Sequence, residues 1–391
     1  MSTAERVPWD SPVVRVVLLS TALAPLGVPL VAPALPAFRE ALSLTDAEAS
    51  LLVSAYFVAG IVLSPFLGAF ADRYGRRRLL VVALVVFSLT GASIALAPPY
   101  GVVVGVRVVQ GTAAAGLFVA TVTLVGDAFD GVQRNAVLGV NAAVLGAGAA
   151  AYPILGGALA GVSWRAPFVA YLLALPAAVV ASRVLPAETR RTARPGYLSA
   201  MARVATSAGA LGYYAATLLT ELLLFGAILT ALPFLLVREY GASPLGIGLV
   251  ITAAEVVAAG AAASNGWLAR RAGDAAIVRA GIATYAVGLL AVPFATSVVG
   301  VAAGAAVVGA GVGFVLPSVD AGLSARVPGD LRAGALSLRN SVTFLGRAAG
   351  PLLFAYLAAD TGYEPLLTAA GVAALAAVAL ATVGSRLRAR P

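Results

Sequence analysis

Long apolar segments recur along almost the whole chain, and they constrain its fold more than any other feature of the sequence. A helix needs about 20 consecutive apolar residues to cross a bilayer. Twelve segments come close to that length or exceed it: residues 13–38, 47–70, 79–97, 100–126, 135–160, 166–185, 208–236, 245–268, 276–297, 299–322, 334–358 and 364–384. Only 11% of the residues are charged, too few to cover a water-soluble globule. We therefore expect an all-α integral membrane protein with twelve transmembrane helices.

The distribution of arginine predicts the orientation of these helices. All 26 basic residues are arginines, and most of them fall at the chain ends and in alternate loops, including the run Arg76-Arg77-Arg78. Short arginine-rich loops stay on the cytoplasmic side of a membrane. We therefore expect both termini on the cytoplasmic side of the plasma membrane. The net charge of +9 then reflects the membrane surface, so we expect a lipid bilayer and no nucleic acid as a partner.

Several kinds of chemistry are excluded by residues that the chain lacks. It has no cysteine and no histidine, so neither thiol chemistry nor a histidine proton switch is available. Any proton coupling must fall to carboxylates. The glycine-rich segments contain no G-x4-G-K-[ST] phosphate loop, and we find no nucleophile and base constellation. We expect no cofactor, no bound metal and no enzymatic activity.

One segment, residues 186–206, reads as a linker because it is rich in arginine and has no long apolar run. It separates an N-terminal bundle of six helices, residues 1–185, from a C-terminal bundle, residues 207–391. Three features recur at a constant offset of 198 residues: Gly68-x-Phe-Ala-Asp-Arg-x-Gly75 as Gly266-x-Leu-Ala-Arg-Arg-x-Gly273, Arg134 as Arg332, and Gly148-x4-Pro153 as Gly346-x4-Pro351. We infer a gene duplication and two pseudo-symmetric bundles that face each other across a central cavity.

Three motifs resemble those of the Major Facilitator Superfamily, and in particular its drug:proton antiporter branch. They are Gly68-Ala-Phe-Ala-Asp-Arg-Tyr-Gly-Arg-Arg-Arg78 after the second segment, Arg107-Val-Val-Gln110-Gly111 in the fourth, and Gly139-x8-Gly148-x3-Tyr152-Pro153-x2-Gly156-Gly157 in the fifth. Tyr152 departs from the family pattern, which has glycine before the proline. The resemblance extends over the whole chain.

This resemblance implies a twelve-helix major facilitator fold and a monomeric secondary active transporter. It implies export of a small amphipathic or cationic molecule by alternating access, in exchange for protons. Two other functions stay open. One is a uniporter or symporter for a sugar or metabolite, and the other is a membrane receptor that transports nothing.

The charged loop after the second segment is the predicted cytoplasmic gate. The resemblance implies that Asp72 acts as a latch on the positive N-terminal end of the helix that starts near residue 333, and that Arg76 pairs with Asp127. In the second half Arg270 stands at the place of Asp72, and we expect it to approach Asp127 or Asp130. The predicted gate residues are Gly68, Asp72, Arg73, Gly75, Arg76 and Asp127.

Four ionisable residues lie well inside apolar segments: Arg107, Glu221, Glu255 and Arg347. A charge that faces lipid is costly, so such residues normally face a cavity or a partner. The family geometry favours Arg107 and Glu221 as cavity residues and a pair between Glu255 and Arg347. Because desolvation favours a protonated carboxyl, Glu221 is the first candidate for proton coupling and Glu255 the second.

The remaining candidates concern packing and the substrate. The helix 5 glycines allow close helix packing, and the family resemblance adds that they close a leak and favour exchange. Aromatic and amide side chains in the apolar segments suit a cavity for amphipathic molecules. The candidate cavity residues are Gln110, Asn141, Tyr213, Tyr214 and Phe225.

Overall fold

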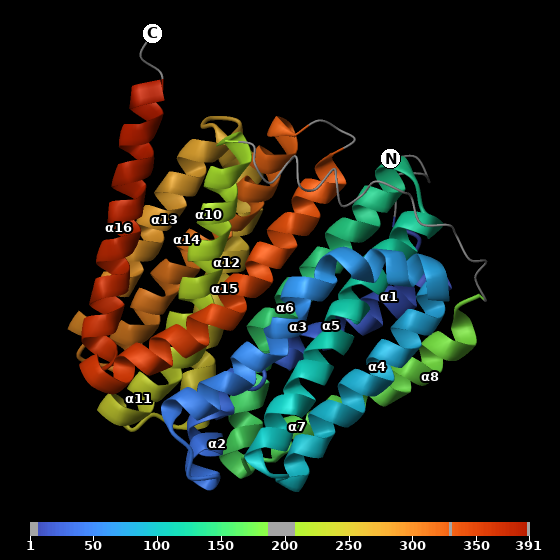
Figure 1. Ribbon diagram of the computed structural model, residues 1–391, viewed down its shortest axis with the longest axis horizontal. Coiled ribbons are helices and arrows are strands. Elements are labelled where there is room, and N and C mark those ends of the chain that lie inside the picture. The colour runs from blue at the N-terminus through green and yellow to red at the C-terminus, as the bar shows by residue number, and fades with distance from the viewer. Residues whose placement is uncertain (1–6, 187–207, 328–330, 389–391) are drawn as a thin grey trace.

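The computed structural model describes residues 7–186, 208–327 and 331–388, which form a bundle of helices without a strand (Figure 1). Twelve helical stretches in this part of the chain are long and apolar enough to cross a membrane, as the sequence predicts. The linker 186–206 falls outside the described residues except for its first position, so the division of the chain at this segment stays a prediction. For residues 64, 65, 67–72, 208, 209, 333 and 385–388 only the backbone is described.

The first six spans contain α1 (Pro12–Leu23), η2 (Ala24–Gly27), η3 (Ala32–Ala34), α2 (Leu35–Ala41), α3 (Asp46–Tyr74), α4 (Arg76–Ser93), η4 (Ile94–Leu96), α5 (Tyr100–Ala128), α6 (Gly131–Val162), α7 (Ala166–Val169), η5 (Ala170–Leu173) and α8 (Ala174–Val184). The last six spans contain α10 (Ala208–Leu223), η6 (Leu224–Ala231), α11 (Leu232–Tyr240), α12 (Pro244–Ala269), α13 (Asp274–Ala291), η7 (Val292–Phe294), α14 (Val298–Arg326), α15 (Arg332–Thr361) and α16 (Tyr363–Arg388).

Prolines mark the places where two spans depart from regular α-helix. In the first span α1 ends at Leu23, and the chain continues through two short 3-10 turns that contain Pro25 and Pro33. In the seventh span the π-helix η6 precedes Pro233. A proline cannot donate the backbone hydrogen bond that continues an α-helix. Backbone carbonyls near such breaks are therefore available to side chains.

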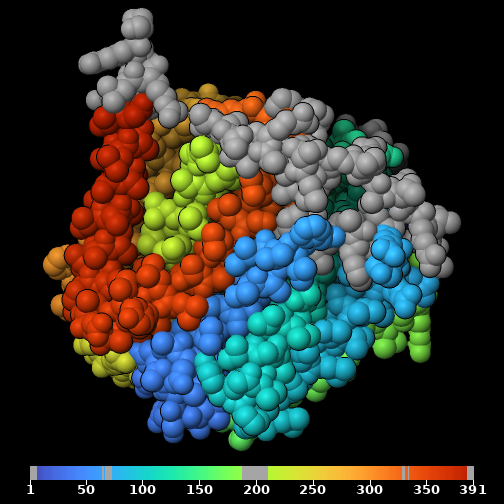
Figure 2. Space-filling view, in the orientation of Figure 1, coloured from blue at the N-terminus to red at the C-terminus, as the bar shows by residue number. Residues whose placement is uncertain are grey.

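The most extensive packing between the first six spans and the last six is that of α3 against α15 and of α6 against α12. Figure 2 shows α15 lying along α3 on the face in view. Gly60 of α3 makes room for the ring of Phe344, which would lie 2.8 Å from a Cβ at that position. At the other pair, Thr252 of α12 donates to the carbonyl oxygen of Ala150 on α6 at 2.7 Å. At these two helix pairs the halves thus meet through a small residue and a polar contact.

The motif of the fifth span lies in α6, and the glycines near its C-terminal end place this helix against its neighbours. A side chain at Gly156 would overlap the carbonyl of Leu30, and one at Gly157 would overlap the carbonyl of Pro244. Pro153 lies inside α6 without ending the helix. This part of the motif therefore brings α6 into backbone contact with both the first span and α12.

The earlier residues of the motif differ from one another in their packing. Gly148 faces the ring of Pro25, which would lie 2.9 Å from a Cβ. Tyr152 donates from its Oη to the carbonyl oxygen of Ala22 at 2.8 Å, so the residue that departs from the family pattern ties α6 to the first span. Gly139 has no heavy atom within 4 Å of where its Cβ would be. Packing does not require glycine there.

We predict that Gly111→Ala destabilises the protein, because a Cβ at Gly111 would overlap the carbonyl of Tyr56 on α3. Overpacking of this kind costs about 1–3 kcal/mol. The measurement is the thermal unfolding midpoint of the purified protein in detergent. Gly105→Ala is the matched control on the same helix, since nothing lies within 4 Å of its Cβ position. Equal midpoints for the two variants would contradict the prediction.

Candidate functional site

An ion pair deep in the last six spans forms the centre of the candidate site. Glu221 comes from the end of α10 and Arg347 from the middle of α15. The Nε of Arg347 lies 2.9 Å from Oε2 of Glu221, and a second guanidinium nitrogen lies 3.1 Å from Oε1. The carboxylate is 1% exposed, whereas the arginine side chain is 31% exposed. The predicted pair of Glu255 with Arg347 is therefore wrong. Arg347 donates both of these hydrogen bonds to the carboxylate of Glu221.

Two glycines on α15 explain why Arg347 reaches this carboxylate. A Cβ at Gly346 would lie 2.9 Å from the Cβ of Glu221, and one at Gly350 would overlap the carbonyl of Leu222. Glycine at this spacing lets two helices approach closely in a membrane. The backbone of α15 consequently runs directly beside α10, and the arginine between the glycines meets the acid.

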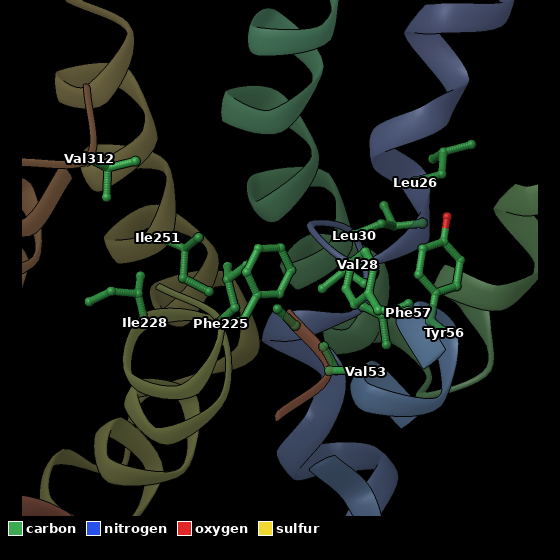
Figure 3. Packing of buried hydrophobic residues seen from close by; sticks show 14 of the residues in the cluster. Leu26, Val28, Leu30, Val53, Tyr56, Phe57, Phe225, Ile228, Ile251 and Val312 are labelled. Atoms are coloured by element: carbon green, nitrogen blue, oxygen red, sulfur yellow. The ribbon is translucent and has the colours of Figure 1, made fainter. Parts of the chain in front are cut away.

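Two aromatic rings complete the surroundings of Arg347. Its guanidinium carbon lies 4.9 Å from the ring centre of Phe225 and 5.6 Å from that of Phe57. The two rings meet edge to face at 5.0 Å, and Figure 3 shows them side by side. A cation at this distance from an aromatic ring is attracted by the ring quadrupole. Phe57 belongs to α3 and Phe225 to η6, so the arginine lies at the boundary between the two halves.

A second carboxylate lies near this pair without a hydrogen-bond partner. Glu255 of α12 is partly exposed and makes no hydrogen bond or ion pair with the described part of the chain. It interacts electrostatically with both Glu221 and Arg347. Tyr285 of α13 interacts with both carboxylates and has a buried hydroxyl without a hydrogen-bond partner among the described residues. When both acids are ionised, this cluster carries one more negative than positive charge.

Arg107 occupies a different environment from the one that the family geometry favours. It is fully buried, and it donates to the carbonyl oxygen of Leu52 at 2.8 Å, to that of Gly27 at 2.9 Å and to Oε1 of Gln110 at 2.7 Å. The Gly27 carbonyl is available because the first span breaks there, and Val31 donates to Val28 instead. Arg107 and Gln110 therefore close a gap in a packed interior and do not line an open space in this structure.

The other candidate cavity residues are also buried here and have identifiable packing roles. Thr21 donates to Oδ1 of Asn141 at 2.6 Å, which links α1 to α6. Tyr213 accepts from Arg326 at 2.6 Å, and Tyr214 donates to the carbonyl of Ala335 at 3.3 Å. The two tyrosines thus connect α10 with α14 and α15. Among these candidates only Phe225 contacts the Glu221 and Arg347 pair.

The predicted cytoplasmic gate is visible in part. Arg76 forms the ion pair with Asp127 that the family resemblance implies. Gly75 has a φ of +86°, which permits the sharp turn from α3 to α4. The guanidinium carbon of Arg73 lies 5.6 Å from the ring centre of Tyr74.

Other parts of that gate stay predictions or differ from expectation. Gly68 lies within α3, and the side chain of Asp72 is outside what the structure describes, so the latch on α15 is untested. Arg270 donates to the carbonyl oxygen of Gly266 at 3.1 Å, in its own helix, and the carboxylate of Asp127 is paired with Arg76.

Sequence reasoning missed a polar cluster at the opposite end of the bundle. Asp46, the first residue of α3, accepts from Arg39 at 2.8 Å, from Arg238 at 2.6 Å and from the Oη of Tyr363 at 2.6 Å. Arg39 belongs to the first half, whereas Arg238 and Tyr363 belong to the second. In the sequence Asp46 resembles an ordinary acid in the first turn of a helix. The one available signal is that Arg39 and Arg238 fall on the predicted outer side, where arginine is scarce.

The Major Facilitator Superfamily sequence model matches residues 17–210 and 214–391. Multidrug resistance protein 2 of Bacillus subtilis is 26% identical over 256 residues, which are 62% of this chain and 63% of that protein. The quinolone resistance protein NorA of Staphylococcus aureus is 28% identical over 229 residues, 58% of this chain and 59% of NorA. The bacillibactin exporter of Bacillus subtilis is 34% identical over 150 residues, 37% of each chain. The alignments span less than two thirds of these relatives.

Solved structures share the fold over nearly the whole chain. A bacterial homologue of the human lysosomal transporter Spinster, in an inward-facing and occupied conformation, aligns with 97% of this chain and 98% of its own at a TM-score of 0.83 and 17% identity. A D-xylose–proton symporter aligns with 95% of this chain and 96% of its own at a TM-score of 0.76 and 16% identity. At these identities the likeness is one of fold alone.

We predict that Asp46→Asn opens the end of the bundle that holds Asp46 more often, because the neutral amide loses the ion pair with Arg238 that joins the two halves. The reporter is a single cysteine at the buried position Val53, in a chain without other cysteines. The rate of labelling by an impermeant maleimide from outside should increase at least about fivefold. This is the change expected when the lost contact stabilises the closed state by about 1 kcal/mol.

Asp10→Asn is the control for this experiment, since the pair of Asp10 with Arg15 is exposed and lies within the first half. An exposed pair of this kind contributes little free energy. Labelling that is equally slow in both variants would rule out a latch at Asp46.

Proposed function

The chain belongs to the Major Facilitator Superfamily, and we propose that it exports a small amphipathic or cationic molecule by alternating access, in exchange for protons. The observation that carries this proposal is the cluster of Glu221, Arg347 and Glu255 at the boundary of the two halves, which has one negative charge in excess when both acids are ionised. Carboxylates inside a membrane protein are typical of substrate and proton pathways. The names of the multidrug resistance, quinolone resistance and bacillibactin export relatives support the direction of transport.

In this proposal Glu255 is the carboxyl that exchanges protons. Glu221 is the weaker candidate, because Arg347 compensates its charge through two hydrogen bonds. An ionised Glu255 has no such partner among the described residues and is stable in an apolar environment only when a cation is near. A proton and a cationic substrate therefore compete for the same excess charge. This competition converts a proton gradient into export of the substrate.

Alternating access requires contacts at each end that break in turn. At the outer end these are the contacts of Asp46 with Arg238 and Tyr363. At the cytoplasmic end they include the proposed contact of Asp72 with α15, for which the ion pair of Arg76 with Asp127 supports the geometry of the loop. We further propose a monomer in the plasma membrane with both termini in the cytoplasm, as the arginine distribution predicts.

The test is a proton-flux assay in liposomes that contain the purified protein. We expect tetraphenylphosphonium to drive proton movement in the wild type, and Glu255→Gln to reduce it to the level of empty liposomes. Glu364→Gln is the matched control, because this acid lies in the first turn of α16, away from the cluster.

The pH dependence has a definite sign. Raising the pH on the side that binds substrate ionises Glu255 and should strengthen cation binding in the wild type, whereas Glu255→Gln should bind with little dependence on pH. Full coupling in Glu255→Gln would exclude this residue. Uptake of a sugar or metabolite by the wild type without proton movement would favour a uniporter, and no transport of any compound would favour a receptor.

A further inference from the structure

The guanidinium of Arg347 is held in the way that a protein holds a bound planar cation. It forms two hydrogen bonds with one carboxylate, at 2.9 and 3.1 Å, and it lies near the rings of Phe225 and Phe57. A planar cation such as a guanidinium can form two parallel hydrogen bonds with a carboxylate and stack on aromatic rings. A compact point charge such as an ammonium group cannot form this fork of two parallel bonds. The pocket around this group, made of Glu221, Phe57 and Phe225, is called here the cation pocket.

The cation pocket lies where a transported molecule would have to bind. Phe57 comes from the first half, and Glu221 and Phe225 come from the second. A site with walls from both halves changes its access when the halves move relative to each other. Glu221 is almost fully covered while Arg347 is partly exposed, so the arginine separates the carboxylate from the accessible space.

A charge count indicates how Arg347 can leave this pocket. A buried carboxylate whose partner is removed is strongly unfavourable, so Glu221 requires a cation at all times. Arg347 also requires an anion, and Glu255 interacts with it electrostatically and has no hydrogen-bond partner in the described chain. Two carboxylates and one arginine leave room for one additional positive charge.

We propose that Arg347 is an internal competitor of the substrate. Ionised Glu255 attracts Arg347 out of the cation pocket, and the substrate then binds Glu221 in its place. Protonation of Glu255 returns Arg347 to Glu221 and displaces the substrate. The pocket selects planar cations with N–H donors, namely amidinium and guanidinium groups. This inference rests on the proposed function, to which it adds the substrate class and the coupling step.

Three further groups interact with these carboxylates, and a fourth pairs with one of the three. Arg347 and Tyr285 interact with both Glu221 and Glu255. Asp320 of α14 also interacts with Glu221, but it pairs with Arg339 of α15 at 3.1 Å. Arg339 therefore offers a matched control for Arg347, since it is a second arginine on the same helix with its own acidic partner.

The experiment measures binding of benzamidinium to the purified protein by titration calorimetry, without a membrane or a gradient. At about pH 8, above the ordinary range of carboxyl groups, Arg347→Ala should bind benzamidinium at least about tenfold more tightly than the wild type, because the competitor is gone. Arg339→Ala should bind like the wild type. Phenyltrimethylammonium, which has the same ring but no N–H donor, should gain much less from Arg347→Ala.

A double-mutant cycle tests the alternative partner of Arg347. Glu255→Gln alone should weaken benzamidinium binding about tenfold, because Arg347 then has no second carboxylate. In the Arg347→Ala background, Glu255→Gln should change the affinity for benzamidinium much less. In the same background, Glu221→Gln should abolish benzamidinium binding. Each protein is first checked for a single peak in size-exclusion chromatography, and Arg347→Met replaces Arg347→Ala if the latter does not fold.

Three results would overturn the inference: equal affinities in the wild type and Arg347→Ala, equal effects of Arg347→Ala and Arg339→Ala, or equal gains for the two ligands. Failure of the proposed function looks different. Benzamidinium binding that follows the predicted pattern, in a protein that moves no protons in liposomes, would retain the cation pocket and exclude the antiport.

Discussion

Charged groups in the interior of this protein have to be satisfied by the protein itself, because hydrocarbon offers neither water nor counter-ions. The chain meets this requirement in two ways. Arg107 receives backbone carbonyls and an amide, so its charge is dispersed within a packed bundle. Arg347 receives a carboxylate. Because carbonyls cannot take up a proton and carboxylates can, only the second arrangement can respond to pH.

The difference between the halves is visible at the predicted repeat offset. At 198 residues, Glu255 corresponds to Phe57, and Tyr285 corresponds to Phe87. The first half therefore carries aromatic rings where the second carries titratable groups. Phe57 nevertheless belongs to the site, since it lies beside Arg347 across the boundary. One half thus supplies an apolar wall of the site, and the other supplies its charges.

Features that depend on local sequence were predictable, whereas the choice of distant partners was not. Apolar length identified the twelve spans, and the family resemblance of the charged loop implied the pair of Arg76 with Asp127. The partner of Arg347 depends on how closely α15 approaches α10, which two glycines decide in three dimensions. The contacts of Asp46 span up to 317 positions in the sequence, so no periodicity reveals them. The burial of Arg107 was not predictable, because the broken first span provides acceptors that a regular helix would not.

The π-helix Leu224–Ala231 follows Glu221 after two residues. Each π-turn holds about one residue more than an α-turn, so residues on its two sides are out of phase by about 100° per extra residue, compared with a continuous α-helix. Rewinding of this segment would rotate Glu221 about the helix axis while Arg238, beyond it, stayed anchored to Asp46. Such rewinding would turn the carboxylate about the helix axis without requiring either half of the bundle to tilt.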